Sequence, residues 1–134
     1  MIKQVIVMRH DLGMRRGKQI AQGAHAAMKV LLDSGGEVHE NYNTDLPPFC
    51  LDVFLTPDMK TWITDSFKKV CVRVESEEEL LNVYQQALDA GLPCAIIKDE
   101  GKTEFHNVHT YTCCAIGPAK SVEIDKITAE LKLL

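Results

Sequence analysis

The chain is poor in aromatic residues and has no long apolar run. Of its 134 residues, only one is Trp, three are Tyr and four are Phe. No apolar stretch approaches the roughly 20 residues that cross a bilayer, and the start Met1-Ile2-Lys3-Gln4 lacks the architecture of a signal peptide. We therefore expect a cytoplasmic protein with no membrane partner.

Common nucleotide-binding and hydrolase signatures are also missing. The chain has neither a GxGxxG dinucleotide fingerprint nor a GxSxG nucleophile elbow. The segment from Gly13 to Lys18 is similar to a P-loop, but only three residues separate its glycines where four are needed. Gln19 also stands where a Mg²⁺-binding Ser or Thr is required. These departures exclude P-loop nucleotide chemistry.

The cysteines do not suggest a disulfide framework. Their number is odd and most lie in apolar runs, which favours reduced, buried thiols in a reducing compartment; they are Cys50, Cys71, Cys94, Cys113 and Cys114. A zinc site built from His106, His109, Cys113 and Cys114 is the alternative. Adjacent cysteines after His-x-x-His match no common zinc spacing, and in a strand they point to opposite faces. We therefore predict no metal site.

The length and composition indicate one soluble globular domain over residues 1–134, with 46% apolar and 25% charged residues. The formal net charge of −4 does not favour a nucleic-acid partner, but its distribution is uneven. Residues 1–30 contain six basic side chains and the single acid Asp11. Such a local patch can bind phosphate in an acidic protein, since attraction acts within about 8 to 10 Å at physiological salt. The alternative is a solvated basic loop.

The hydrophobic pattern predicts alternating strands and helices. We expect strands over 2–8, 69–74, 94–97 and 111–116, and helices over 17–33, after Thr56, after the capping box 76–79, and over 122–131. Residues 49–55 could form a further short strand, whereas 37–48, which include Pro47-Pro48, are expected to be a loop. Two helical crossovers make three strands parallel and leave the fourth antiparallel. The predicted fold is a three-layer α/β/α structure with a mixed four-stranded sheet.

The stretch from Met8 to Ala26 organises this fold, because it joins the first strand to the first helix. One predicted helical stripe is apolar and is expected to face the core; it contains Ile20, Ala24, Ala27, Met28 and Leu31. The opposite stripe is polar; it contains Lys18, Gln22, His25 and Lys29. Ligands of α/β proteins usually bind at such junctions, at the carboxyl ends of strands.

A second polar cluster, Asp99, Lys102 and Thr103, follows the predicted strand 94–97. If that strand is parallel to the first, Lys18 and Asp99 emerge at the same edge of the sheet. A carboxylate, an ammonium group and a hydroxyl can together orient a water molecule and stabilise an oxyanion. Alternatively, Asp99 and Thr103 only stabilise an Asx-type turn around Gly101.

Several separated motifs give the chain a resemblance to a known family. They are Arg-x-Asp-Leu-x-Met-x-x-Gly-Lys-x-x-Ala-Gln-x-x-His-Ala at 9–26, Asp-x-Gly-x-Thr at 99–103, Ile-Gly-Pro at 116–118 and Ile-Asp-Lys-x-Thr-x-x-Leu-Lys-Leu at 124–133. In this order they resemble the archaeal and eukaryotic type of peptidyl-tRNA hydrolase. The resemblance covers residues 2–34 and about 69–134.

The resemblance implies hydrolysis of the ester between a peptide and the 3′-terminal ribose of tRNA, on a mixed four-stranded sheet. It also implies frequent dimerisation and no cofactor or required metal. The implied active-site residues are Lys18, Asp99, Thr103, Gln22 and His25. Thr112 aligns with a further hydroxyl position, and the side chains expected to hold tRNA phosphates are Arg9, Arg15, Arg16, Lys29 and Lys102.

The chain departs from the family pattern in three single positions and one segment. Lys102 replaces a common arginine, Glu104 a common glutamine and Ala115 a common glycine. Residues 36–68 are longer than the corresponding family segment, and could be a lid, a dimer element or a partner site. A non-catalytic tRNA-binding or regulatory module on the same fold is therefore an alternative function. Hydrolysis of a related ester or amide is a third.

Overall fold

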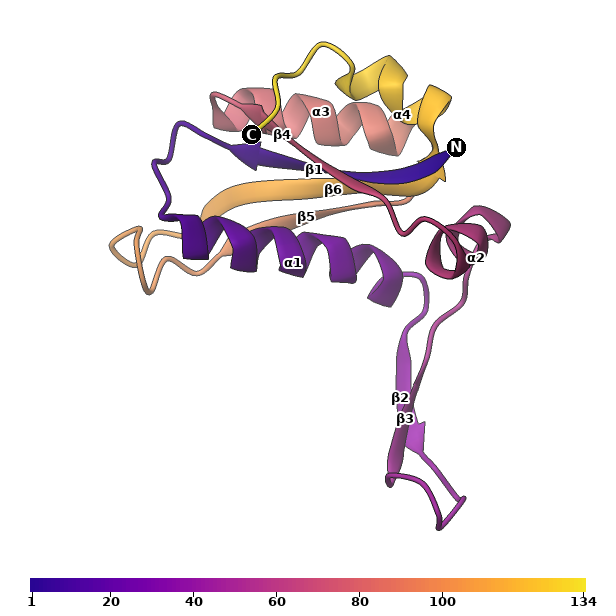
Figure 1. Cartoon of the computed structure of the whole chain (residues 1–134). Coiled ribbons are helices and arrows are strands. Elements are labelled where there is room, and N and C mark those ends of the chain that lie inside the picture. The colour runs from indigo at the N-terminus through magenta and orange to yellow at the C-terminus, as the bar shows by residue number, and fades with distance from the viewer.

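Four strands form one mixed sheet in the order β4-β1-β6-β5 in the computed structural model, which describes residues 1–134 (Figure 1). They are β1 (Ile2–Arg9), β4 (Lys69–Val74), β5 (Cys94–Asp99) and β6 (Thr110–Lys120). β1 pairs in parallel with β4 and antiparallel with β6, and β5 pairs antiparallel with β6. Three strands therefore run one way and β6 runs the other way, which confirms the predicted sheet. β6 lies inside the sheet, between β1 and β5.

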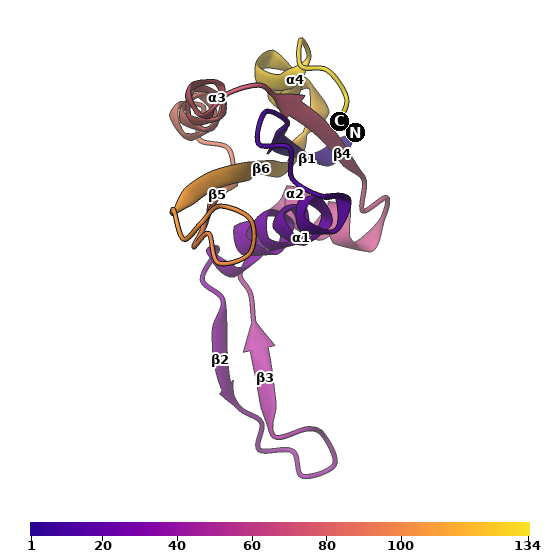
Figure 2. The same ribbon diagram turned by 90° about the vertical axis from the view of Figure 1, so that its left-hand side faces the viewer.

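Helices cover both faces of the sheet (Figures 1 and 2). One layer contains α1 (Arg16–Leu32) and α2 (Pro57–Thr64), and the other contains α3 (Glu77–Asp89) and α4 (Ser121–Thr128). The predicted caps are present, because the side chains of Thr56 and Ser76 accept hydrogen bonds from the backbone N–H groups of Met59 and Glu79. The predicted three-layer α/β/α architecture is confirmed. None of these helices combines the length and the apolar character that a bilayer crossing requires.

Strand β6 is buried from Thr112 to Ala119, so it separates two hydrophobic cores. Cys114 packs in the core that contains Leu80, beneath α3 and α4. Cys113 packs in the core that contains Met59, beneath α1 and α2. Because neighbouring strand residues alternate between faces, these two thiols cannot serve one metal site.

The predicted buried face of α1 is wrong. Ile20 is 67% exposed and Met28 is 57% exposed, whereas the buried residues of the helix are Gln22, Gly23, Ala26 and Val30. Gly23 faces the sheet, since a Cβ at position 23 would lie in ordinary contact, 3.7 Å from side chains of Ile6 and Met8. The helix thus rests closely on the sheet along its small residues. The predicted apolar and polar stripes of α1 therefore lie on either side of its buried face.

The prediction of a loop over 37–48 is wrong for its first four residues. Glu37–Glu40 form β2, which pairs antiparallel with β3 (Phe49–Asp52), so the short strand predicted within 49–55 is confirmed. These two strands and the loop between them, residues 37–52, form an arm that extends away from the rest of the chain beyond the end of α1 (Figures 1 and 2). In contrast, Met59 and Trp62 of α2 are buried. The segment 36–68 therefore contains a projecting arm and a helix of the core.

Trp62 anchors α2, so its truncation should destabilise the fold. Its Nε1 donates a hydrogen bond to the Lys68 carbonyl at 2.8 Å, and its ring centroid lies 4.4 Å from that of Phe67. We expect Trp62→Ala to lower the free energy of unfolding by about 3 to 5 kcal/mol in urea titrations. The matched control is Ile63→Ala on the same helix, where the side chain is 39% exposed and a loss below about 1 kcal/mol is expected. Equal losses would contradict the anchoring role.

Candidate active site

Lys18 and Asp99 meet where α1 begins and β5 ends. Lys18 Nζ donates hydrogen bonds to Asp99 Oδ1 at 2.8 Å and to Thr103 Oγ1 at 2.9 Å. The Lys18 and Asp99 side chains are only 15% and 13% exposed. Gln22 Nε2 also donates to Asp99 Oδ1, at 3.2 Å. The structure therefore brings together four of the five predicted active-site residues through direct contacts.

These side chains line a hollow of about 270 Å³. The fifth predicted residue, His25, is exposed on α1 and lines the same hollow without a hydrogen bond to the other four. Eight of the nine lining residues are not hydrophobic; the full set is Lys18, Gln22, His25, Ile97, Lys98, Asp99, Glu100, Lys102 and Thr103. A hollow of this composition fits a polar, charged ligand better than an apolar one.

Gly101 holds the second oxygen of Asp99. Its N–H donates to Asp99 Oδ2 at 2.9 Å, which is the Asx-type turn considered as an alternative. Gly101 has φ +82°, and a Cβ there would lie 2.3 Å from the Val108 carbonyl oxygen. Only glycine fits this position. The turn uses Oδ2 of Asp99 and the contact with Lys18 uses Oδ1, so both are present together. The turn therefore holds the carboxylate in position for Lys18.

Thr112 lies beneath the site and does not line the hollow. It is fully buried on β6, and its hydroxyl donates a hydrogen bond to Gln22 Oε1. Since the amide oxygen is thereby occupied, the amide nitrogen of Gln22 faces Asp99. The geometry thus gives Thr112 a positioning role for Gln22, where the alignment of hydroxyl positions had suggested a substrate contact.

Asp99 is held as a carboxylate. Burial alone would raise its pKa. The hydrogen bonds from Lys18 and Gly101, the charge of Lys18 and the hydrogen bond from Gln22 together outweigh burial, so the pKa of Asp99 lies below its usual value. Its four lone-pair positions receive three donors, of which two reach Oδ1 and one reaches Oδ2. One acceptor position therefore stays free on Oδ2.

The predicted phosphate-binding cations are not equally placed. The Arg15 side chain is 89% exposed beside the start of α1, and Lys102 is 77% exposed on the loop after β5. Arg9 is only 11% exposed, and it donates to Asp11 at 2.6 Å and to the Tyr111 carbonyl at 3.1 Å. Arg15 and Lys102 are thus accessible near the hollow, whereas Arg9 is held by groups of the protein.

The remaining two cations lie farther along α1 or on its other flank. Lys29 pairs with Asp33 at 3.2 Å in the last turn of the helix. Arg16 lines a separate apolar hollow together with Ile20 and Cys71. Glu104, the acidic departure from the family pattern, places its Oε2 3.4 Å from the backbone N of Arg15. It therefore adds a negative charge at the start of α1, where anions are favoured.

The structure contains no group of three or more His, Cys, Asp or Glu side chains arranged to hold a metal ion. All five cysteines are free thiols, but only Cys113 and Cys114 are buried, so burial of the set is confirmed only in part.

The pKa of Asp99 should respond to the loss of Lys18. In Lys18→Ala, burial remains but a charge and a hydrogen bond are lost, so the pKa of Asp99 should rise in an NMR titration of its carboxyl carbon. In the wild type the depressed pKa stabilises the fold at neutral pH, and this stabilisation is lost as the pH falls from about 3.9 through the folded-state pKa. The control is Lys29→Ala, because Lys29 pairs with Asp33 and its loss should leave the Asp99 titration unchanged. An unchanged Asp99 titration in Lys18→Ala would contradict the assigned cause.

Comparison with known proteins identifies the family. The family model described as peptidyl-tRNA hydrolase PTH2 matches residues 2–134. Proteins named peptidyl-tRNA hydrolase are similar over almost their whole length: one from Methanocaldococcus jannaschii is 42% identical over 99% of this chain and 100% of the relative. One from Aeropyrum pernix is 40% identical over 98% of this chain and 94% of the relative. One from Methanopyrus kandleri is 37% identical over 100% of this chain and 99% of the relative. The chain therefore belongs to the peptidyl-tRNA hydrolase PTH2 family.

Proposed function

We propose that this protein hydrolyses peptidyl-tRNA, cleaving the ester between the peptide and the 3′-terminal ribose and so releasing the tRNA for reuse. The observation that carries the proposal is the contact of Lys18 with both Asp99 and Thr103 in a polar hollow. Family membership and the printed names of the relatives support the same reaction. No observation favours a non-catalytic binding module.

Lys18 is the group we assign to the developing negative charge. An ammonium group has three donors, and Lys18 uses two of them on Asp99 and Thr103. The third can donate to the ester oxygen that becomes an oxyanion, or to the leaving ribose oxygen. Thr103 accepts from Lys18, so its own hydroxyl proton can donate to the substrate. Donors fixed in advance by protein contacts stabilise a transition state without reorganisation.

Asp99 is the group we assign to the attacking water. Its free acceptor position on Oδ2 can hold a water molecule beside the donors of Lys18 and Thr103. Because its pKa lies below the usual value, Asp99 is a weak base, and orientation of the water is a better-supported role than its deprotonation in the resting site. Gln22 positions the carboxylate, and His25 at the edge of the hollow contacts the ribose or the peptide.

tRNA phosphates would be held by the exposed cations nearest the hollow, Arg15 and Lys102. Ion pairs between such exposed groups and Glu100 or Glu104 contribute little, so phosphate can replace them. We also propose that the protein acts as a homodimer in the cytoplasm. The free thiols and the tRNA substrate fit that compartment, and the exposed apolar flank of α1 supports association.

Cleavage of a purified N-blocked aminoacyl-tRNA tests the proposal. We expect the wild type to release tRNA, and Lys18→Ala and Asp99→Asn to lose roughly two or more orders of magnitude in kcat while tRNA binding changes little. The control is Lys126→Ala on α4, where the cation is 69% exposed on the opposite face of the sheet. A wild type that binds tRNA without cleaving it would overturn the hydrolase assignment in favour of a binding module.

Phosphate binding should make the affinity for tRNA fall with salt. Removing one phosphate contact in Arg15→Ala should weaken binding and reduce the slope of log affinity against log salt by about 0.7 to 0.9. Lys126→Ala should leave the slope unchanged, since that side chain lies on α4 across the sheet. If the Arg15→Ala slope matches the wild-type slope, Arg15 does not contact phosphate.

A further inference from the structure

The arm exposes apolar side chains that nothing in its own chain covers. The register pairs Val38 with Leu51 and Glu40 with Phe49, so these four side chains share one face of the ribbon. Val38 is 68% exposed, Phe49 63% and Leu51 44%. An isolated two-stranded hairpin is only marginally stable in water, so this amphipathic ribbon needs a surface to rest on.

The charge of the arm limits what that surface is. The arm contains four carboxylates and no Lys or Arg; they belong to Glu37, Glu40, Asp45 and Asp52. An acidic ribbon repels tRNA phosphates, and it also repels the same arm of another molecule. The matching surface must therefore be apolar and bordered by cations.

Such a surface exists on the exposed flank of α1, the side that faces β4. Two neighbouring hollows, of about 330 and 290 Å³, share Ala24 in their walls. Ile20 lines one and Met28 lines the other. The charged side chains of the lining are Arg16 in the first hollow and Lys69 in the second, and no acidic side chain lines either. We call this surface the α1 groove.

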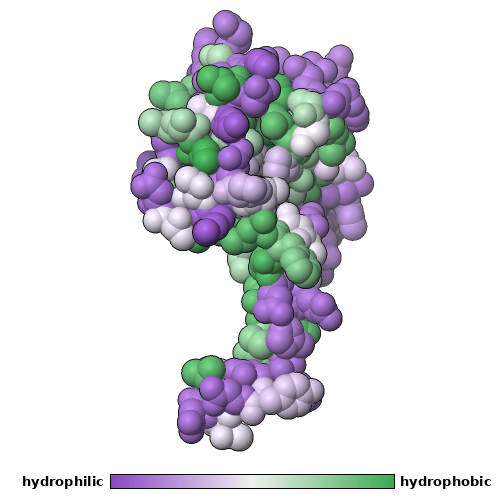
Figure 3. Space-filling model, turned by 90° about the vertical axis from the view of Figure 1, so that its right-hand side faces the viewer, coloured by the Kyte–Doolittle hydropathy of each residue, from purple (hydrophilic) through white to green (hydrophobic).

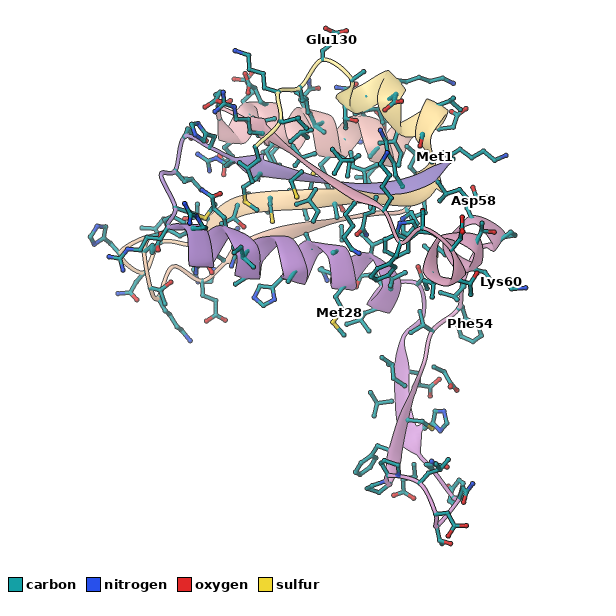
Figure 4. All side chains as sticks on the ribbon, viewed as in Figure 1. Met1, Met28, Phe54, Asp58, Lys60 and Glu130 are labelled. Carbon is teal, nitrogen blue, oxygen red and sulfur yellow. The ribbon has the colours of Figure 1, made fainter.

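The arm extends away from the α1 groove of its own chain. Figures 1 and 2 show the arm pointing away from the sheet and from α1, which it leaves at the helix end. Figure 4 shows Met28 pointing outward on the side of α1 toward which the arm extends. Figure 3 shows hydrophobic side chains gathered where the arm meets the rest of the molecule, where Phe54 is 71% exposed. Each chain thus presents an arm and a complementary groove that are both unoccupied.

We propose that two copies of this chain exchange arms, with the apolar face of each arm in the α1 groove of the other copy. Glu40, which shares this face, then approaches Arg16 or Lys69 of the second molecule, and Val38, Phe49 and Leu51 cover Ile20, Ala24 and Met28. This contact is reciprocal, as a two-fold dimer requires. The inference rests on the proposed homodimer and assigns its contact surface.

Three variants test the exchange in light-scattering measurements of molecular mass. In the armless variant an Asn-Gly turn replaces residues 38–51; Glu37 and Asp52 are cross-strand partners, so a two-residue turn can join them. The groove variant is Ile20→Glu, at a position 67% exposed, and Asn82→Glu on the exposed face of α3 is its charge-matched control. Thermal unfolding verifies that each variant is folded.

We expect the wild type and Asn82→Glu to be dimers, and the armless and groove variants to associate at least roughly tenfold more weakly. A mixture of these two variants should form dimers again, because one intact arm then meets one intact groove. An armless variant that dimerises like the wild type overturns the exchange but leaves the homodimer. A wild type that is monomeric overturns both, and neither result affects the cleavage assay.

Discussion

The ion pair between Lys18 and Asp99 holds together segments that lie 81 residues apart in sequence. Lys18 enters from the first turn of α1, and Asp99 ends β5, so the pair connects the two chain segments that build the site. Both side chains are largely shielded from water. A charge in such a shielded position is costly unless it is paired and hydrogen-bonded. Each charge is therefore stabilised by the other. Thr103 accepts a further hydrogen bond from Lys18, and Gln22 and Gly101 donate hydrogen bonds to Asp99.

Strand β6 makes this meeting possible. It lies between β1 and β5, and α1, which follows β1 in the chain, packs over β6 and β5, so Lys18 reaches Asp99 at the end of β5. Its buried Thr112 directs the amide of Gln22 toward Asp99, which explains why α1 buries a polar residue against the sheet. The desolvation cost of that amide is offset because both of its ends are hydrogen-bonded. The orientation that buries Gln22 also leaves Ile20 and Met28 in solvent, so the contact of Gln22 with Asp99 and the exposed apolar flank of α1 have one origin.

Local signals in the sequence were sufficient where one residue type has one physical role. Thr56 and Ser76 identified helix starts because their hydroxyls cap backbone N–H groups, and the apolar run at 2–8 identified a buried strand. The buried face of α1 could not be read from its periodicity, since the buried residues Gly23 and Ala26 contribute little to an apolar count and Gln22 contributes nothing. β2 was missed because Glu37–Glu40 has no buried face, so it has no alternation to detect. For the site, the motif residues indicated Lys18, Asp99 and Thr103, and the turn at Gly101 is local to that motif. The support that Thr112 gives to Gln22 depends on a contact across the fold.

The central claim is that Lys18 and Asp99 act as one unit on the ester of peptidyl-tRNA. A double-mutant cycle of the cleavage rate tests it most directly, with wild type, Lys18→Ala, Asp99→Ala and the double variant measured under single-turnover conditions. If the pair is one unit, the double variant loses about as much rate as the slower single variant, because either change already disables the site. Losses that multiply would show two independent contributions and would contradict the account.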